Sequence, residues 1–450
     1  MRTLQKMQQK MSYVQIIALG YFLLILLGSL LLFLPFATAV GEETSFLTAV
    51  FTATSATCVT GLVVVDTYMH WTVFGKIVIL LLIQVGGLGF MTMGVLFAMC
   101  LKQRITLRTR GILQESINAL QVGGVVRLVK HALIGTAIVE AAGAALLSIR
   151  FIPVFGWGKG ILFGIFHAVS AFCNAGFDLM GEYSGEYSSL TSFDNDIVIN
   201  VVIMALIIIG GLGFAVWEDI RTNRFRVKRY RLHTKLVLLV TGILLLGGTA
   251  LFYLLEKDNL MAGMGVRETL LTSAFSAVTA RTAGFNTIDT GALTEGSKFL
   301  TIVLMFIGGS PGSTAGGIKT VTLMVLIAFV WSNLRHATGC NLFGRRLDEE
   351  TVKKASTVMM ISLMLVVTAT ITIAIIQPLP LLDVIFEIVS AIGTVGMSTG
   401  ITRDLSSAVR VIIILLMYCG RLGSMSLALS FTERRRVAPI QLPTEKIMIG

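Results

Sequence analysis

Four segments of this chain share one pattern, in which a phenylalanine begins a short apolar stretch that ends at a glycine nine or ten residues later. The segments run from Phe51 to Gly61, from Phe166 to Gly176, from Phe275 to Gly284 and from Phe386 to Gly396. Their glycines lie 115, 108 and 112 residues apart. A unit that occurs four times at nearly constant spacing indicates four structural repeats around a common axis.

Composition places these repeats in a membrane. The chain is 55% apolar and 14% charged, whereas a soluble domain carries about 25% charged residues. Eight apolar stretches approach the ~20 residues that span a bilayer; they cover roughly 14–38, 72–101, 127–152, 196–218, 235–256, 298–332, 355–377 and 408–431. The first follows Arg2, Lys6 and Lys10 as a signal peptide would, but it is too long for one, so we expect a transmembrane helix.

The four glycine segments lie between these stretches and are too short to span, which favours re-entrant half-helices. We therefore expect an all-α polytopic membrane protein. It would contain four repeats of transmembrane helix, re-entrant pore helix and transmembrane helix (M1-P-M2), with pseudo-four-fold symmetry around one central pore. The approximate repeats are 10–105, 122–225, 233–335 and 352–433, a single ion-translocating membrane domain followed by a cytoplasmic tail at 434–450.

The distribution of charge predicts the orientation. Under this topology the inner segments hold 25 of the 36 lysines and arginines, which places both termini in the cytoplasm. The bias also explains the net charge of +11 without a nucleic-acid partner. Acidic residues gather in the outer segments, where they either concentrate cations or form an ordinary solvated surface. The five cysteines and five histidines show no metal-ligand spacing.

The turns that end at the repeat glycines are the candidate cation site. A conduction path must supply oxygen ligands to a desolvated cation, and backbone carbonyls with Thr and Asn side chains can do so. The candidate selectivity-filter residues are Thr57, Cys58, Val59, Thr60 and Gly61; Cys173, Asn174, Ala175 and Gly176; Thr282, Ala283 and Gly284; and Thr394, Val395 and Gly396. The carboxyl ends of the short helices would favour a cation. The competing interpretation is that small residues only allow close helix packing.

One inner helix cannot be continuous. The run at 308–317 combines glycines and a proline with hydroxyl residues, which a helix interior does not tolerate. Its residues are Gly308, Gly309, Ser310, Pro311, Gly312, Ser313, Thr314, Ala315, Gly316 and Gly317. We expect a loop beneath the filter that obstructs the path, which is a gate. A GxxxGxxxG packing face is the alternative, and a phosphate-binding loop is disfavoured because Ile318 separates Gly317 from Lys319.

Three further features remain open. Gly-rich runs at 84–90, 209–214 and 418–424 indicate close packing of the inner helices or hinges. Arg421 lies within an apolar stretch, so it is a functional candidate. It would form a positive barrier, hold loop carbonyls or pair with an acid such as Glu140 or Glu387. Arg281 adjoins the third filter turn and is expected to brace it.

These segments resemble the membrane subunit of the Ktr/Trk/HKT superfamily, specifically the bacterial KtrB/KtrD type. The matching motifs are the runs 56–62, 84–90, 172–177, 278–286 and 393–397, and the likeness covers nearly the whole chain. The resemblance implies potassium uptake through a potassium ion site at the four repeat glycines, and Gly61 favours potassium over sodium. It also implies that the loop at 308–317 is the intramembrane gate and that Arg421 is the basic residue near the pore.

The same resemblance implies the partners. It predicts a homodimer in the bacterial plasma membrane, seated on a cytosolic RCK-type nucleotide-binding ring (KtrA/KtrC-like). The regulatory nucleotide belongs to that ring, so no cofactor is expected in this chain, and membrane lipid is the other partner of the basic inner loops. The alternative function is a sodium-permeable or weakly selective cation transporter of the same superfamily. Sodium coupling stays open, whereas an alternating-access solute carrier and an enzyme are both disfavoured.

Overall fold

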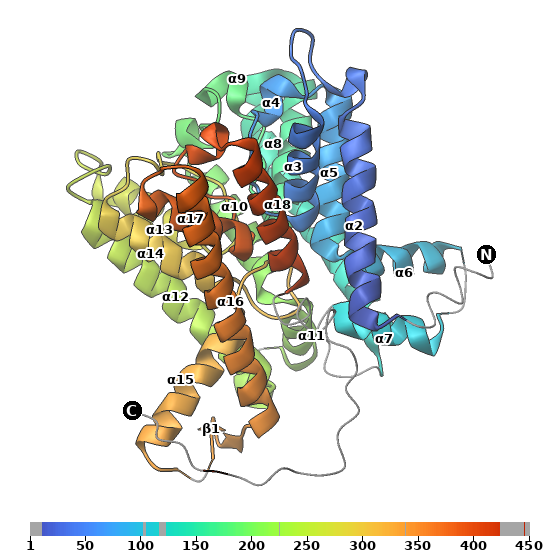
Figure 1. The fold of residues 1–450 in the computed structure, drawn as a ribbon, viewed down its shortest axis with the longest axis vertical. Coiled ribbons are helices and arrows are strands. Elements are labelled where there is room, and N and C mark those ends of the chain that lie inside the picture. Colours follow the sequence, from blue (N-terminus) through green and yellow to red (C-terminus); the bar gives the residue numbers. More distant parts are fainter. Residues whose placement is uncertain are drawn as a thin grey trace.

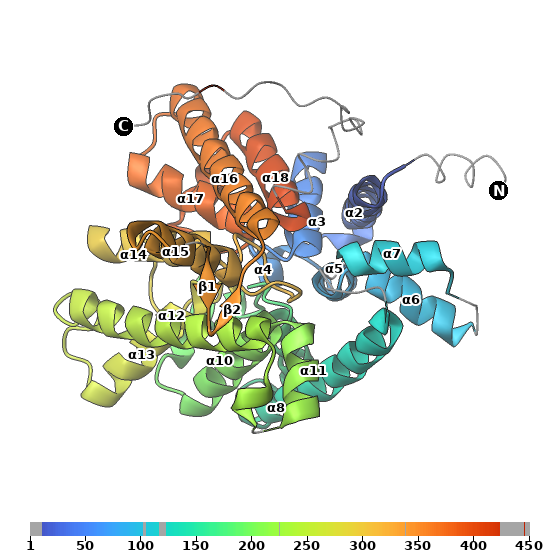
Figure 2. The same ribbon diagram turned by 90° about the horizontal axis from the view of Figure 1, so that it is seen from below.

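The computed structural model describes residues 11–101, 105–116, 123–224, 226–337, 339–423 and 445. Across these residues the regular structure is helical, apart from one antiparallel ribbon of β1 (Asn341–Leu342) and β2 (Arg345–Arg346). Seen from below, groups of helices follow one another around the centre in chain order (Figure 2). The expected tail at 434–450 lies outside the described residues, apart from Glu445.

Among the described residues, four helices are long and apolar enough to cross a membrane, or five if the bent pair at 197–223 is counted as one span (Figure 1). They are α2 (Tyr13–Leu32), α8 (Val125–Phe172), α12 (Leu232–Glu256) and α16 (Glu349–Ile376). Each coincides with the first span of an expected repeat. Large apolar side chains on these helices face outward, such as Leu246 at 76% and Ile375 at 79% exposure. Because lipid tails solvate such side chains, this distribution fits a membrane environment.

A short helix follows each long one. Three are separate: α3 (Phe46–Cys58), α13 (Val266–Thr279) and α17 (Leu381–Gly393). The fourth is the end of α8 itself, which continues past a kink at Gly156, where φ is 78°. In the second repeat, a kink within α8 therefore takes the place of the loop that joins the long helix to the short helix in the other repeats. The four repeat phenylalanines are fully buried in these short helices and anchor them in the core.

The second helix of each repeat is interrupted or ends at a glycine with positive φ. The paired segments are α5 (Val73–Leu88) with α6 (Phe90–Cys100), α10 (Ile197–Leu212) with α11 (Phe214–Asn223), and α14 (Glu295–Ile307) with α15 (Thr320–Leu334), followed by α18 (Ser407–Leu422). The glycines are Gly89, Gly213, Gly308 and Gly423, with φ of 83°, 95°, 63° and 85°. The bend between α10 and α11 is 93°. The expected break in 298–332 is present, whereas the stretches 72–101 and 196–218, expected as single spans, are divided at Gly89 and Gly213.

The remaining elements connect these helices. They are η1 (Pro35–Ala37), α4 (Thr67–His70), α7 (Leu107–Ser116), α9 (Gly181–Ser184), η2 (Thr191–Phe193), η3 (Val227–Arg229) and η4 (Ile401–Asp404). Side-chain caps begin several helices because the first amide groups have no partner within the helix. The Asp196 carboxylate, for example, accepts from the amides of Val198 and Ile199 at the start of α10.

Glycines let the inner helices pack directly on the short ones. A Cβ atom at Gly86, Gly210 or Gly420 would lie under 3.0 Å from a carbonyl oxygen near the end of a short helix. Those oxygens belong to Thr57, Phe172 and Ile392. The Gly-rich runs therefore serve close packing at their first glycine, and their last glycine lies at the helix break. Close packing is therefore confirmed at the first glycine, and a hinge at the last glycine stays a prediction.

Substituting Gly210 tests this packing. In Gly210→Ala the methyl group collides with the Phe172 carbonyl oxygen, and overpacking of this kind costs about 1–3 kcal/mol. We expect a lower melting temperature of the purified protein in detergent. The matched control is Gly247→Ala in α12, where no atom lies within 4 Å; it should leave the melting temperature unchanged or raise it. Equal melting temperatures for the two variants would contradict the packing argument.

Candidate functional site

Each short helix ends in the same two-step turn. The first residue of this turn adopts the left-handed conformation, and a glycine with positive φ follows two residues later. The left-handed residues are Val59, Asn174, Thr282 and Thr394, with φ of 58°, 58°, 69° and 49°. The glycines Gly61, Gly176, Gly284 and Gly396 have φ of 90°, 70°, 83° and 89°. Left-handed backbone is strained for valine and threonine, and such strain persists only where the surroundings impose it.

The four glycines form a closed ring, here called the glycine ring. A Cβ atom at any of them would lie under 3.0 Å from the carbonyl oxygen that precedes the next glycine. The pairs are Gly61 with Ala175, Gly176 with Ala283, Gly284 with Val395 and Gly396 with Thr60, which returns to the first turn. All four glycines are thus brought together, as expected. Only glycine fits such a close approach of backbones.

A buried hydroxyl side chain stands behind each turn. The Oγ atom of Ser55 accepts from the amide of Gly61 at 3.1 Å, and that of Ser390 accepts from Gly396 at 3.1 Å. The Ser170 hydroxyl donates to the Phe177 carbonyl at 2.7 Å, and the Thr279 hydroxyl donates to the Phe285 carbonyl at 2.6 Å. These hydrogen bonds hold the turns from behind, because a buried amide or carbonyl without a partner is costly.

Sequence reasoning missed these four hydroxyl residues, although a signal was present. Each lies four positions after the repeat phenylalanine. The third repeat has one residue fewer between its phenylalanine and its glycine. Accordingly, Ala283 donates its amide to the carbonyl four residues back, whereas Thr60, Ala175 and Val395 donate to the carbonyl five residues back. The shorter spacing is absorbed by a tighter helix end.

The other expected filter residues are buried beside the ring, where Thr57, Cys58, Cys173 and Asn174 are at most 1% exposed. The hydroxyls of Thr57, Thr60 and Thr394 have no hydrogen-bond partner within the described part of the chain. The Asn174 amide donates to the Thr282 hydroxyl at 3.4 Å and so joins two turns. The ring is therefore lined by carbonyls and by hydroxyl oxygens that have no hydrogen-bond partner in the described residues. The carboxyl ends of four helices direct negative potential toward it.

Two side chains left open by the sequence lie behind the turns. The Gln84 amide donates to the Glu140 carboxylate at 3.1 Å, and the Cys173 thiol lies 3.9 Å from the same carboxylate. Glu140 thus contacts the second turn from α8. Arg281 is 7% exposed, and its Nε atom has no hydrogen-bond partner within the described residues, so its role as a brace of the third turn stays a prediction.

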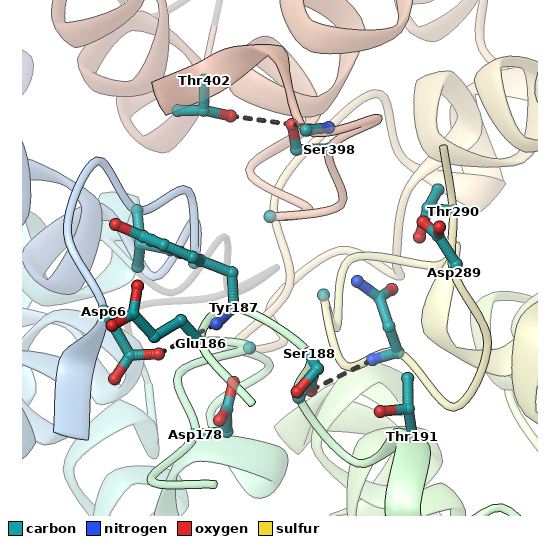
Figure 3. Close-up of a pocket in the computed structure, with 18 of the residues that line it drawn as sticks. Asp66, Asp178, Glu186, Tyr187, Ser188, Thr191, Asp289, Thr290, Ser398 and Thr402 are labelled. Atoms are coloured by element: carbon teal, nitrogen blue, oxygen red, sulfur yellow. Dashed lines mark hydrogen bonds between the residues drawn. The ribbon is translucent and has the colours of Figure 1, made fainter. Parts of the chain in front are cut away.

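An acidic pocket lies on the side of the ring that the charge bias predicts to face outward (Figure 3). It has a volume of about 500 Å³ and reaches all four ring glycines. The carboxylates of Asp66, Asp178, Glu186 and Asp289 line it, together with Arg403. Because burial dominates, the pKa of the Asp178 carboxyl rises from 3.8 to about 7, and the nearby Asp66 charge adds to the rise. The pocket can concentrate cations at the ring.

The loop between α14 and α15, residues 308–319, lies on the inner side of the ring; we call it the inner loop. Its Ser310 amide donates to the Gly211 carbonyl at 3.1 Å, and its Gly312 carbonyl accepts from the Phe214 amide at 2.9 Å. The Thr314 hydroxyl donates to the Phe172 carbonyl at 3.2 Å. The expected run 308–317 is therefore a loop, buried against the second repeat rather than a helical packing face.

Two cations hold the inner loop. Arg421 donates to the Thr314 carbonyl at 2.6 Å, to the Gly87 carbonyl at 2.9 Å and also to the Gly86 carbonyl. Its partners are carbonyl oxygens, so the pairing with Glu140 or Glu387 is not formed. Lys319 donates to the loop's own carbonyls, at 2.7 Å to Ala315 and 3.1 Å to Gly316. Arg421 thereby ties the inner loop to α5 and α18.

This geometry defines a class: a helical membrane protein whose short helices converge on a ring of glycines. Comparison with known proteins then gives the family. A sequence model of TrkH, described as a cation transport protein, matches residues 2–437. The chain is 42% identical to the potassium/sodium uptake protein NtpJ of Enterococcus hirae, with 99% of each chain covered. The chain belongs to this cation transport family, which confirms the resemblance read from its motifs.

Two further comparisons agree. The chain is 41% identical to the Ktr system potassium uptake protein B of Bacillus subtilis, over 97% of this chain and 96% of that one. It also superposes on the crystal structure of the potassium transporter TrkH from Vibrio parahaemolyticus with a TM-score of 0.74. That match covers 94% of this chain and 86% of the other at 18% identity, so it supports the fold.

The raised pKa of Asp178 predicts a pH-dependent stability. Its folded-state pKa of about 7 exceeds the ordinary value of 3.8, so this carboxyl lowers stability progressively as pH rises between the two values. Asp178→Asn removes that loss, and the amide oxygen can still accept from Met180. We expect the variant to gain melting temperature over the original protein at pH 8, and to gain less at pH 5, both measured in choline chloride.

The control for this prediction is Asp258→Asn, whose side chain is 88% exposed. It should shift the melting temperature equally at both pH values. A gain for Asp178→Asn that is no larger at pH 8 than at pH 5 would show that burial of this carboxyl is not costly.

Proposed function

We propose that this chain forms a channel-like potassium-uptake path across the bacterial plasma membrane. Four M1-P-M2 repeats with pseudo-four-fold symmetry would surround one pore, with both termini in the cytoplasm. The observation that carries the proposal is the glycine ring, in which four backbone turns meet around a common centre. Rings of carbonyls replace the hydration shell of an alkali cation. The relatives named as potassium uptake proteins support the substrate.

In this proposal the four turns are the selectivity filter, and potassium is the substrate held near Gly61, Gly176, Gly284 and Gly396. The acidic outer pocket supplies cations to the filter from outside. The chain needs no catalytic group, and its family is one of transporters rather than enzymes. A weakly selective or sodium-permeable path is the second candidate, because the relative from Enterococcus hirae is named a potassium/sodium uptake protein.

The inner loop is the proposed gate. It lies directly below the filter, and its Gly316 packs against Thr394 of the fourth turn. The loop has little regular structure to lose when it moves, and its attachment to α18 and α5 depends on the hydrogen bonds of Arg421. Breaking those bonds would detach the loop from α5 and α18, while its hydrogen bonds to the second repeat would remain.

Regulation is assigned to a partner. A relative bears the name of a Ktr system component, and such naming fits a membrane subunit that works with a cytosolic regulatory subunit. We propose a homodimer seated on a nucleotide-binding ring, with the basic inner loops as the contact surface. Rubidium uptake into a potassium-transport-deficient bacterium, with and without sodium and a co-expressed ring protein, tests the function. Absence of rubidium uptake under every condition would refute it.

Selectivity should depend on the ring glycines. In Gly61→Ser and Gly284→Ser the new Cβ atom collides with a neighbouring carbonyl oxygen, which widens the ring. We expect the potassium-to-sodium permeability ratio to fall on the order of tenfold, equivalent to about 1.4 kcal/mol. Gly263→Ser is the control, since that glycine also has positive φ (87°) but no atom within 4 Å. An unchanged ratio in both ring variants would mean that the filter lies elsewhere.

Gating should depend on Arg421. Arg421→Gln removes the guanidinium that bonds to three carbonyls, so we expect basal rubidium flux to rise several-fold; shortening 309–316 should have the same effect. Arg410→Gln is the control. Arg410 lies on the same helix, but its guanidinium donates to the Arg403 carbonyl at 2.8 Å rather than to the inner loop. If neither Arg421→Gln nor the shortened loop raises the flux, the loop is not the gate.

A further inference from the structure

A groove between α8 and α11 lies apart from the residues proposed for the filter and the gate. Its volume is about 910 Å³. One end is lined by the cations Arg127, Lys130 and Arg221, and the other by Ile134, Ile138 and Trp217. Figure 2 shows α11 beside α8 on the face seen from below. This is the face that the charge bias assigns to the cytoplasm.

The cations of the groove are not neutralised within the protein. Across the described residues, none of Arg127, Lys130 and Arg221 takes part in an ion pair. The acid that lines the groove, Glu218, pairs with His131 at 2.9 Å. The groove therefore presents unbalanced positive charge, which calls for an anionic ligand.

The order of side chains along α8 matches an amphipathic ligand. Arg127, Lys130, Ile134 and Ile138 recur every three or four residues, so they share one helical face. At 1.5 Å per residue this face extends about 16 Å from the first to the last. Ile134 and Ile138 are 49% and 64% exposed on a helix that spans the membrane. A ligand here has its charge at the membrane surface and its apolar part within the bilayer.

We propose that this groove binds an anionic phospholipid of the cytoplasmic leaflet. The phosphate contacts Lys130, Arg127 and Arg221, and one acyl chain lies along Ile134 and Ile138 against Trp217. A soluble anion would match the charged end alone, whereas a phospholipid matches both ends. Juxtamembrane cations contribute about 1 kcal/mol each to the binding of anionic lipid.

The wall of the groove is joined to the inner loop. Trp217 donates to the Ile209 carbonyl at 3.0 Å, and its ring lies 5.7 Å from that of Phe172, next to the second turn. Phe214, at the start of α11, donates its amide to the Gly312 carbonyl of the inner loop at 2.9 Å. Lipid that packs against Trp217 thereby fixes α11 and the loop contact. This regulatory part rests on the proposed gate.

Fluorescence quenching tests the binding. The full chain carries four tryptophans; Trp157 and Trp331 are exposed and are replaced by phenylalanine, while Trp71 is buried. This protein is reconstituted in phosphatidylcholine vesicles that contain brominated phosphatidylglycerol or brominated phosphatidylcholine at the same mole fraction. We expect Trp217 to be quenched more strongly by the anionic lipid. Lys130→Gln with Arg221→Gln should reduce that preference about 30-fold, equivalent to about 2 kcal/mol.

The matched control removes two exposed cations outside the groove, Lys228→Gln with Lys353→Gln, and should keep the preference. Equal quenching by the two lipids would overturn the proposal. So would quenching by neither, the result expected if a second copy or a cytosolic partner covers the groove. A preference that survives Lys130→Gln with Arg221→Gln would also overturn it.

Rubidium uptake into the same vesicles tests the link to the gate. In phosphatidylglycerol vesicles, Lys130→Gln with Arg221→Gln should raise basal uptake several-fold, and in pure phosphatidylcholine the variant and the parent should be equal. Equal uptake in both vesicle types would overturn the regulatory part. Absence of uptake by every protein would instead refute the proposed function, while the quenching result still decides whether the groove binds lipid.

Discussion

The close approach of four backbone turns is the constraint on which the rest of the structure depends. Each ring glycine lies so near the next turn's carbonyl oxygen that no side chain fits between them. The turns also hold Val59, Asn174, Thr282 and Thr394 in left-handed backbone, which is unfavourable unless the surroundings impose it. The buried phenylalanines, the hydroxyls behind the turns and the glycines of the inner helices all act to hold this arrangement.

Compensation of buried charge is the second theme. Arg421 and Lys319 lie beside the inner loop, where a cation without ligands would be costly. Their ligands are backbone carbonyls rather than carboxylates. The carbonyl of Thr314 belongs to the inner loop, whereas those of Gly86 and Gly87 belong to α5. Arg421 thus connects the proposed gate to α5 without a carboxylate partner, whereas Lys298 and Asp383, at 3.2 Å, connect α14 and α17 through an ion pair.

Charged side chains of opposite sign also lie on the two sides of the glycine ring. Carboxylates line the outer pocket, helix carboxyl ends face the glycine ring, and arginines and lysines occupy the inner side. In the proposed path, a cation entering through the pocket would thus meet favourable potential until it reached the inner loop. The groove beside α11 extends the loop's contacts to the lipid-facing surface, since Phe214 and Trp217 belong both to the groove and to the packing around the second turn.

The sequence by itself determined the membrane class, the four repeats, the glycines that meet and the broken segment at 308–317, because periodicity, composition and glycine content are local properties. It indicated Arg421 but left its partner open. Only the tertiary structure decided that Arg421 bonds to carbonyls of α5 and the inner loop, that Ser55 and its three counterparts support the turns, and that α8 kinks at Gly156. The bonds of Arg421 join residues more than 100 positions apart, which no local pattern encodes. The hydroxyl contacts span only six or seven positions, but they form only because the neighbouring turns impose the turn geometry.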